Sequence, residues 1–156
     1  MKNRDPLFMM KLIKWYPPLL GAGIRVTQVA PDFRSVRVEM RLTRLNVNAV
    51  GTHFGGSLYS MCDPWFMLML IHALGKDYIV WDKAASIQFI RPGRGKVLAE
   101  FCITPELVDD LRQRADAGEK VEPTLQADVL DTDGKIVAHV EKLLYVRKKN
   151  SESKVA

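Results

Sequence analysis

The stretch from Leu58 to Leu74 constrains the fold more than any other part of the chain. It is almost entirely apolar, and its only charged side chain is Asp63, which Pro64 follows directly. A helix on a protein surface shows one apolar stripe and one polar face, whereas apolar side chains here cover nearly the whole circumference. We therefore predict one long helix surrounded by protein. A carboxylate inside it is costly unless it is hydrogen-bonded, paired or used, so Asp63 is the first candidate functional residue.

Lipid is the competing environment for such a segment. A membrane-spanning helix needs roughly 20 apolar residues, and this stretch is shorter and carries Asp63, Pro64 and His72. We therefore predict no membrane span. The net charge of +5 and the isoelectric point near 9.3 are compatible with an anionic ligand. We predict no nucleic-acid partner, because the chain lacks an arginine-rich run with interleaved aromatic residues.

The compartment follows from the cysteines and the N-terminus. Cys62 falls in the apolar helix and Cys102 in a predicted strand, so we expect two buried thiols, as in a reducing compartment. Lysines interrupt the first apolar run, which argues against a signal peptide. A cytoplasmic protein is the expectation. The histidines and acids show no metal-ligand spacing, so no metal site is predicted.

The remaining sequence predicts two strands before the long helix and four after it. Residues 35–43 alternate apolar and polar side chains, as a strand with one buried face does. The turn Asp131-Thr132-Asp133-Gly134 predicts a hairpin. The predicted strands span residues 24–29, 35–43, 78–91, 96–104, 124–130 and 135–147, and the predicted helices span 6–16, 58–74 and 105–117.

These elements predict an α+β fold in which an antiparallel sheet wraps its apolar face around one long central helix. We expect three segments along the chain. An N-terminal helix occupies residues 1–20, the main domain residues 21–148, and a polar, disordered tail residues 149–156.

The loop and first helical turns between residues 46 and 63, with the sequence NVNAVGTHFGGSLYSMCD, resemble the hotdog-fold thioesterases. The most similar group is the phenylacetyl-CoA thioesterase-like branch, with an uncharacterised thioesterase-like family inside that superfamily. The resemblance implies a hotdog fold and an acyl-CoA thioesterase activity. It also implies that Asn48 holds water or substrate, that the N–H of Gly55 binds the thioester oxygen beside Gly56, and that Asp63 is the base or nucleophile.

The same resemblance brings in residues that depart from the family's pattern. The family usually places histidine directly before Gly-Gly, where this chain has Phe54, and His53 stands one residue earlier. A polar residue on the following strand supports the carboxylate in that family, and Asp82 falls near that position with Lys83 beside it. A structural ion pair is the alternative for these two, since adjacent strand residues point to opposite faces.

Helix geometry places a further condition on the site. Asp63 lies eight residues beyond Gly55, which is roughly 12 Å along a helix. One thioester carbon cannot touch both within a single chain. A two-fold dimer could bring Gly55 of one chain to Asp63 of its partner. We therefore expect a homodimer, or a dimer of dimers, with sites at the interface.

Arg91, Arg94 and Lys96 flank a Pro-Gly-Arg-Gly turn. They match the phosphates of coenzyme A, although a solvated basic turn explains them as well. No cofactor is expected beyond coenzyme A as part of the substrate. Two alternatives to the hydrolase stay open: a non-catalytic acyl-CoA binder or sensor, and a hotdog dehydratase that uses His53 and Asp63 as acid and base.

Overall fold

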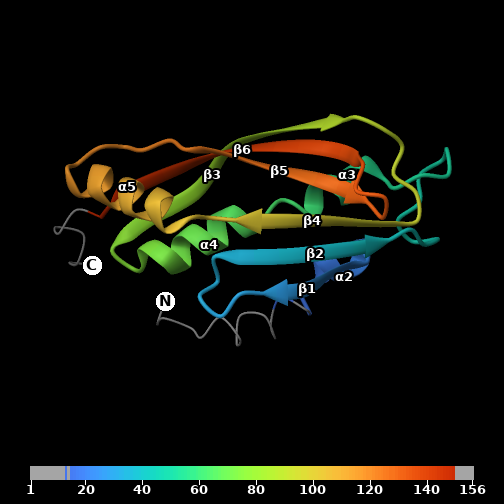
Figure 1. The fold of residues 1–156 in the computed structure, drawn as a ribbon, viewed down its shortest axis with the longest axis horizontal. Helices are drawn as coiled ribbons and strands as arrows, with labels where there is room; N and C mark the ends of the chain where they lie inside the picture. The colour runs from blue at the N-terminus through green and yellow to red at the C-terminus, as the bar shows by residue number, and fades with distance from the viewer. Residues whose placement is uncertain (1–12, 14, 150–156) are drawn as a thin grey trace.

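A computed structural model describes residue 13 and residues 15–149 (Figure 1). Its elements follow the predicted order. They are α2 (Pro17–Ala22), β1 (Ile24–Val29), β2 (Ser35–Arg41), α3 (Gly55–Ser60), α4 (Trp65–Leu74), β3 (Tyr78–Phe89), β4 (Lys96–Cys102), α5 (Pro105–Asp116), β5 (Thr124–Asp131) and β6 (Ile136–Lys148). The predicted α+β class and the β5–β6 hairpin are confirmed.

The six strands form one antiparallel sheet in the order β1-β2-β4-β5-β6-β3. The chain leaves the sheet after β2, forms α3 and α4, and returns as β3 at the opposite edge (Figure 1). β3 pairs with β6 from Tyr78↔Lys148 to Phe89↔Ala138, so the other side of β3 is a free edge. The connection through α3 and α4 therefore crosses from one edge of the sheet to the other.

The core lies between α4 and the inner face of the sheet. The buried side chains of β2 alternate as predicted, with Val36, Val38 and Met40 facing inward. Phe101 of β4 contacts α4, where its ring packs edge-on against that of Phe66 at a centroid distance of 5.3 Å. Burying such a side chain contributes about 1.5–3 kcal/mol, so the helix is fixed mainly by this apolar contact.

The prediction of one continuous helix over residues 58–74 is wrong. α3 ends at Ser60 and α4 begins at Trp65, with Asp63 and Pro64 in the break between them. Proline has no N–H to donate to the carbonyl of the preceding turn, and its ring clashes there. The carbonyl of Met61 instead accepts the indole N–H of Trp65 at 2.6 Å. The break places Asp63 at a bend rather than within a helix.

The N-terminal prediction needs a second correction. The predicted helix over residues 6–16 lies largely outside the described residues, and Pro17 begins a helix instead of only ending one. Tyr16 is extended, as a residue before proline prefers, and Pro17 takes the first helical position, where its missing N–H is not needed. Of the predicted 149–156 tail, only Lys149 is described, and its N–H donates to the carbonyl of Asp77.

Two further sequence expectations concern burial. Cys62 is buried as expected, but Cys102 is exposed because it falls on the outward side of the β4 pleat. Among the described residues, no helix is both long enough and apolar enough to cross a bilayer.

Candidate active site at the α3–α4 break

Asp63 projects from the break beside the end of α3. Tyr59 lies four residues earlier, so its side chain and that of Asp63 share one helical face. The Tyr59 hydroxyl donates a hydrogen bond to Asp63 Oδ1 at 2.8 Å. The sequence predicts a buried Asp63, and this is wrong for the single chain, in which 49% of the side chain is exposed. The carboxylate is therefore both anchored and accessible.

The buried charge at this site belongs to Lys142 of β6, whose side chain is only 1% exposed. Its ammonium lies 2.8 Å from Asp63 Oδ1, 3.1 Å from Asp82 Oδ2 and 3.3 Å from the Tyr59 hydroxyl oxygen. Three acceptors therefore surround its three N–H groups. We call Tyr59, Asp63, Asp82 and Lys142 the carboxylate cluster.

Burial and pairing oppose each other within this cluster. Burial disfavours the charge on Lys142, but the hydrogen bonds to Asp63, Tyr59 and Asp82 outweigh it and raise the pKa of the ammonium above its usual value. At Asp82 the balance is reversed: burial raises the pKa of the carboxyl despite the attraction of Lys142. Asp82 Oδ1 is also buried without a hydrogen-bond partner among the described residues. Burial thus opposes the ionised form of Asp82.

Cys62 lies next to the cluster but is not a candidate nucleophile. Burial raises the pKa of its thiol to about 12. The thiolate is the reactive form of cysteine, so Cys62 stays protonated at neutral pH and fills core space.

The two glycines begin α3. Phe54 precedes the helix without a side-chain cap, and within the described part of the chain the N–H groups of Gly55 and Gly56 have no acceptor. Aromatic rings lie over both: a Cβ added at Gly55 would lie 2.9 Å from Cζ of Phe89, and one added at Gly56 would collide with the ring of Phe54. Each ring is 57% exposed. The helix start is thus shielded by movable side chains, not by backbone.

The polar side chains of the preceding loop are used within the loop. Asn48 donates to the Thr52 hydroxyl and the His53 carbonyl, while its Oδ1 accepts from the N–H groups of Val50 and Thr52. All four hydrogen-bonding positions of its amide are therefore filled. In this arrangement Asn48 shapes the turn that leads into α3.

His53 is buried, and in the described part of the chain it shares no hydrogen bond or ion pair with the carboxylate cluster. Its Nε2 lies 3.1 Å from the Gly95 carbonyl oxygen, which requires a proton on that nitrogen. Burial lowers the pKa of the imidazole, and its Nδ1 is buried without a partner in the described part of the chain. His53 thus ties the loop to the turn after β3 through the Gly95 carbonyl.

The predicted basic residues separate into two groups. Lys83 forms an ion pair with Glu122 at 2.7 Å, and Lys96 forms one with Glu39 at 3.3 Å. Arg91 and Arg94 are exposed in the turn between β3 and β4. That turn is joined to the loop before α3 through the His53 N–H, which donates to the Gly93 carbonyl. The two arginines therefore lie at the same end of the domain as Gly55.

Comparison with protein families identifies the family of this chain. A family model described as a domain of unknown function, DUF4442, matches residues 5–146. The chain belongs to the DUF4442 family. Comparison with curated proteins gave no significant match.

Solved structures show the fold of this DUF4442 chain. A Pseudomonas aeruginosa protein described as a probable thioesterase has a TM-score of 0.80 at 21% identity, covering 92% of this chain and 97% of its own. A Haemophilus influenzae thioesterase has a TM-score of 0.67 at 15% identity, covering 92% and 94%. A mutant of the phenylacetic acid degradation protein PaaI from Thermus thermophilus has a TM-score of 0.60 at 21% identity, covering 83% and 98%. The DUF4442 chain therefore has the hotdog fold.

Sequence reasoning joined some of these residues and missed others. Asp63 and Asp82, predicted to act together, both contact the ammonium of Lys142, and Tyr59 contacts Asp63 and Lys142. Neither Lys142 nor Tyr59 was predicted. The missed signal was the alternation of β6, where Lys142 occupies an inward position between the buried Val140 and Leu144. A lysine at such a position requires a buried partner.

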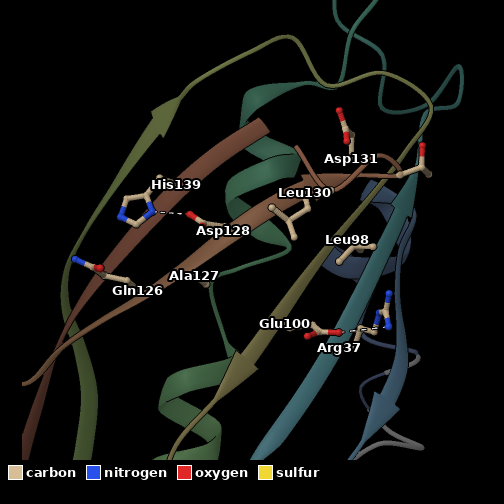
Figure 2. Close-up of a pocket in the computed structure, with 11 residues that line it drawn as sticks. Arg37, Leu98, Glu100, Gln126, Ala127, Asp128, Leu130, Asp131 and His139 are labelled. Carbon is tan, nitrogen blue, oxygen red and sulfur yellow. Dashed lines mark hydrogen bonds and ion pairs between the residues drawn. The ribbon is translucent and has the colours of Figure 1, made fainter. Parts of the chain in front are cut away.

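A hollow in this DUF4442 chain lies on the outer face of the sheet, with a volume of about 570 Å³ (Figure 2). Most of its polar side chains are already engaged: His139 contacts Asp128 at 2.6 Å, Arg37 contacts Glu100 at 3.3 Å, and Asp131 accepts from the N–H groups of the β5–β6 turn. The hollow is separated from Asp63 by the sheet itself, so it does not form part of the site.

Proposed function

We propose that this protein hydrolyses an acyl thioester, with an acyl-CoA as the substrate class. The observation that carries the proposal is the Asp63 carboxylate, which is fixed by Tyr59 and Lys142 yet half exposed in a hotdog domain. An anchored, accessible carboxylate is suited to act as a general base. The free N–H groups at the start of α3 supply the second requirement, donors for a developing oxyanion.

The proposed reaction uses one water molecule. Asp63 takes a proton from water as the water oxygen attacks the thioester carbon, and the carbonyl oxygen becomes an oxyanion. The Gly55 N–H donates to that oxyanion. The tetrahedral intermediate then collapses, the carbon–sulfur bond breaks, and the proton on Asp63 passes to the leaving thiolate. Direct attack by Asp63, giving an anhydride that water then cleaves, leads to the same acid and free thiol.

Two copies of the chain are needed in this proposal. Gly55 and Asp63 lie at opposite ends of α3, and its six residues alone rise about 9 Å. β3 offers an edge for pairing. No charged side chain occurs from Ala84 to Ile90, and the last two residues of this stretch, Phe89 and Ile90, are exposed. An uncharged strand edge that has no partner can pair with another strand. Pairing of two β3 edges would place the Gly55 of one chain near the Asp63 of the other.

Coenzyme A would enter as part of the substrate. Arg91 and Arg94 are exposed at the same end of the domain as Gly55, and guanidinium groups bind phosphates through paired donors. Asn48 and His53 would contribute indirectly, because their hydrogen bonds shape the loop that leads into Gly55.

Thiol release tests the activity directly. The purified protein is incubated with short, medium, long and aryl acyl-CoAs, and free coenzyme A is measured with a thiol reagent. We expect turnover with at least one acyl class, and the series identifies that class. Acyl-CoA binding without thiol release from any substrate would contradict hydrolysis and leave a non-catalytic binder.

Mixed dimers test where the site lies. Gly55→Pro removes the N–H at the first helical position, where proline is tolerated after an extended residue such as Phe54. Asp63→Asn removes the base. Each variant alone should be inactive, whereas refolding them together in equal amounts should restore about a quarter of wild-type activity, because half of the dimers then carry one intact site. Sites built within one chain would give no recovery on mixing.

A further inference from the structure

The two oxygens of the Asp63 carboxylate are not equivalent. Oδ1 accepts from the Tyr59 hydroxyl at 2.8 Å and from the Lys142 ammonium at 2.8 Å. Oδ2 has no hydrogen-bond partner among the described residues, and 49% of the side chain is exposed. The Lys142 ammonium and the Tyr59 hydroxyl therefore fix Oδ1, and they leave Oδ2 without a hydrogen-bond donor.

We infer that Lys142 and Tyr59 are positioning residues, which hold Asp63 Oδ1 so that Oδ2 is the oxygen that takes the proton from water. This inference rests on the proposed hydrolase function and assigns its reacting atom. A free carboxylate rotates about its terminal bond, whereas one held at Oδ1 by two donors from different elements keeps a single orientation. Tyr59 comes from α3 and Lys142 from β6, so the sheet fixes the geometry of the helix break.

Lys142 acts through Asp63 and not on the substrate. Its three N–H groups face Asp63, Asp82 and Tyr59, which leaves none to donate to a ligand. Asp82 serves a separate purpose in this arrangement. When Asp63 takes up a proton during the reaction, the ammonium still has Asp82 as its counter-ion, so no buried charge is left unpaired.

Lys142 and Tyr59 together hold Asp63 Oδ1, and we call these two residues the clamp. Lys142→Met tests the clamp. Methionine fills similar space without charge. Loss of orientation at a reacting group lowers rates by about 10²-fold, so we expect kcat to fall about that much while KM changes little. A kcat that falls at unchanged KM separates the loss of an orienting contact from a loss of substrate binding. The groups around the Lys142 ammonium are Tyr59, Asp63, Asp82 and the protonated thiol of Cys62.

Matched variants separate positioning from general damage. Lys148→Met removes another ion-paired lysine of the same strand, which bonds Asp116 at 2.9 Å on the surface, and it should leave kinetics unchanged. Tyr59→Phe removes one hydroxyl and should lower kcat about tenfold. If Lys142→Met fails to fold, Lys142→Met with Asp82→Asn is assayed instead, since it leaves no unpaired Asp82 charge. If neither lysine variant folds, Tyr59→Phe alone decides.

The outcomes are distinct from those that test the hydrolase itself. A wild-type protein without turnover overturns the proposed function, and the assignment of the reacting oxygen falls with it, whereas wild-type turnover leaves the inference to be decided by the variants. Wild-type kcat in folded Lys142→Met and Tyr59→Phe would overturn the inference. So would an equal loss of kcat in Lys142→Met and Lys148→Met, because a general structural effect would then explain both.

Discussion

Asp63→Asn is expected to abolish thiol release while leaving acyl-CoA binding intact. Asparagine keeps an Oδ1 that can accept from Tyr59 and Lys142, but its amide nitrogen cannot take a proton from water. General-base catalysis contributes typically about 10²–10⁴-fold, so kcat should fall within that range. Thiol release at saturating substrate measures kcat, and calorimetric titration with the preferred acyl-CoA measures affinity. The affinity should change less than about threefold if Asp63 acts only in the transition state.

Asp133→Asn is the matched control, since this carboxylate lies exposed in the β5–β6 turn. It should show wild-type kcat. Retained turnover in Asp63→Asn would remove Asp63 from the reaction and leave the carboxylate cluster as a purely structural ion pair. Loss of substrate affinity in Asp63→Asn would instead place Asp63 in ground-state binding.

Trp65→Ala is expected to give the largest loss of stability. The side chain is fully buried at the start of α4, its ring centroid lies 6.3 Å from that of Phe101, and its indole N–H donates to the Met61 carbonyl at 2.6 Å. Replacing a buried tryptophan by alanine costs about 3–5 kcal/mol. The lost hydrogen bond adds to this because it leaves a buried carbonyl unpaired. Chemical denaturation at fixed protein concentration measures the change in the free energy of unfolding.

The control is the same substitution at Trp15, whose side chain is 76% exposed. It should change the free energy of unfolding by less than about 0.5 kcal/mol. A loss below about 1 kcal/mol in Trp65→Ala would mean that the core collapses into the space left behind, contrary to the rigid packing expected of protein interiors. The thiol-release assay of this variant also reports whether the bend that carries Asp63 depends on the indole.

Local patterns explain why so much of the fold followed from sequence. The alternation in β2 and β4 and the hairpin turn after β5 act over a few residues, and each was placed within two or three residues of its observed bounds. The hydrophobicity of the segment after Gly56 likewise predicted the core element. The prediction that this element is one continuous helix was wrong. An apolar run shows which residues are buried, but not whether Pro64 bends or ends a helix.

The sequence by itself determined an α+β chain with six antiparallel strands around an apolar helical segment, and it singled out Gly55 and Asp63, because periodicity and helix starts are properties of neighbouring residues. Only the tertiary structure decided what surrounds Asp63. Lys142 is 79 residues away along the chain, and it reaches Asp63 because β6 lies beside β3 under the break between α3 and α4. A contact between side chains so far apart depends on strand order and register, which no local pattern encodes.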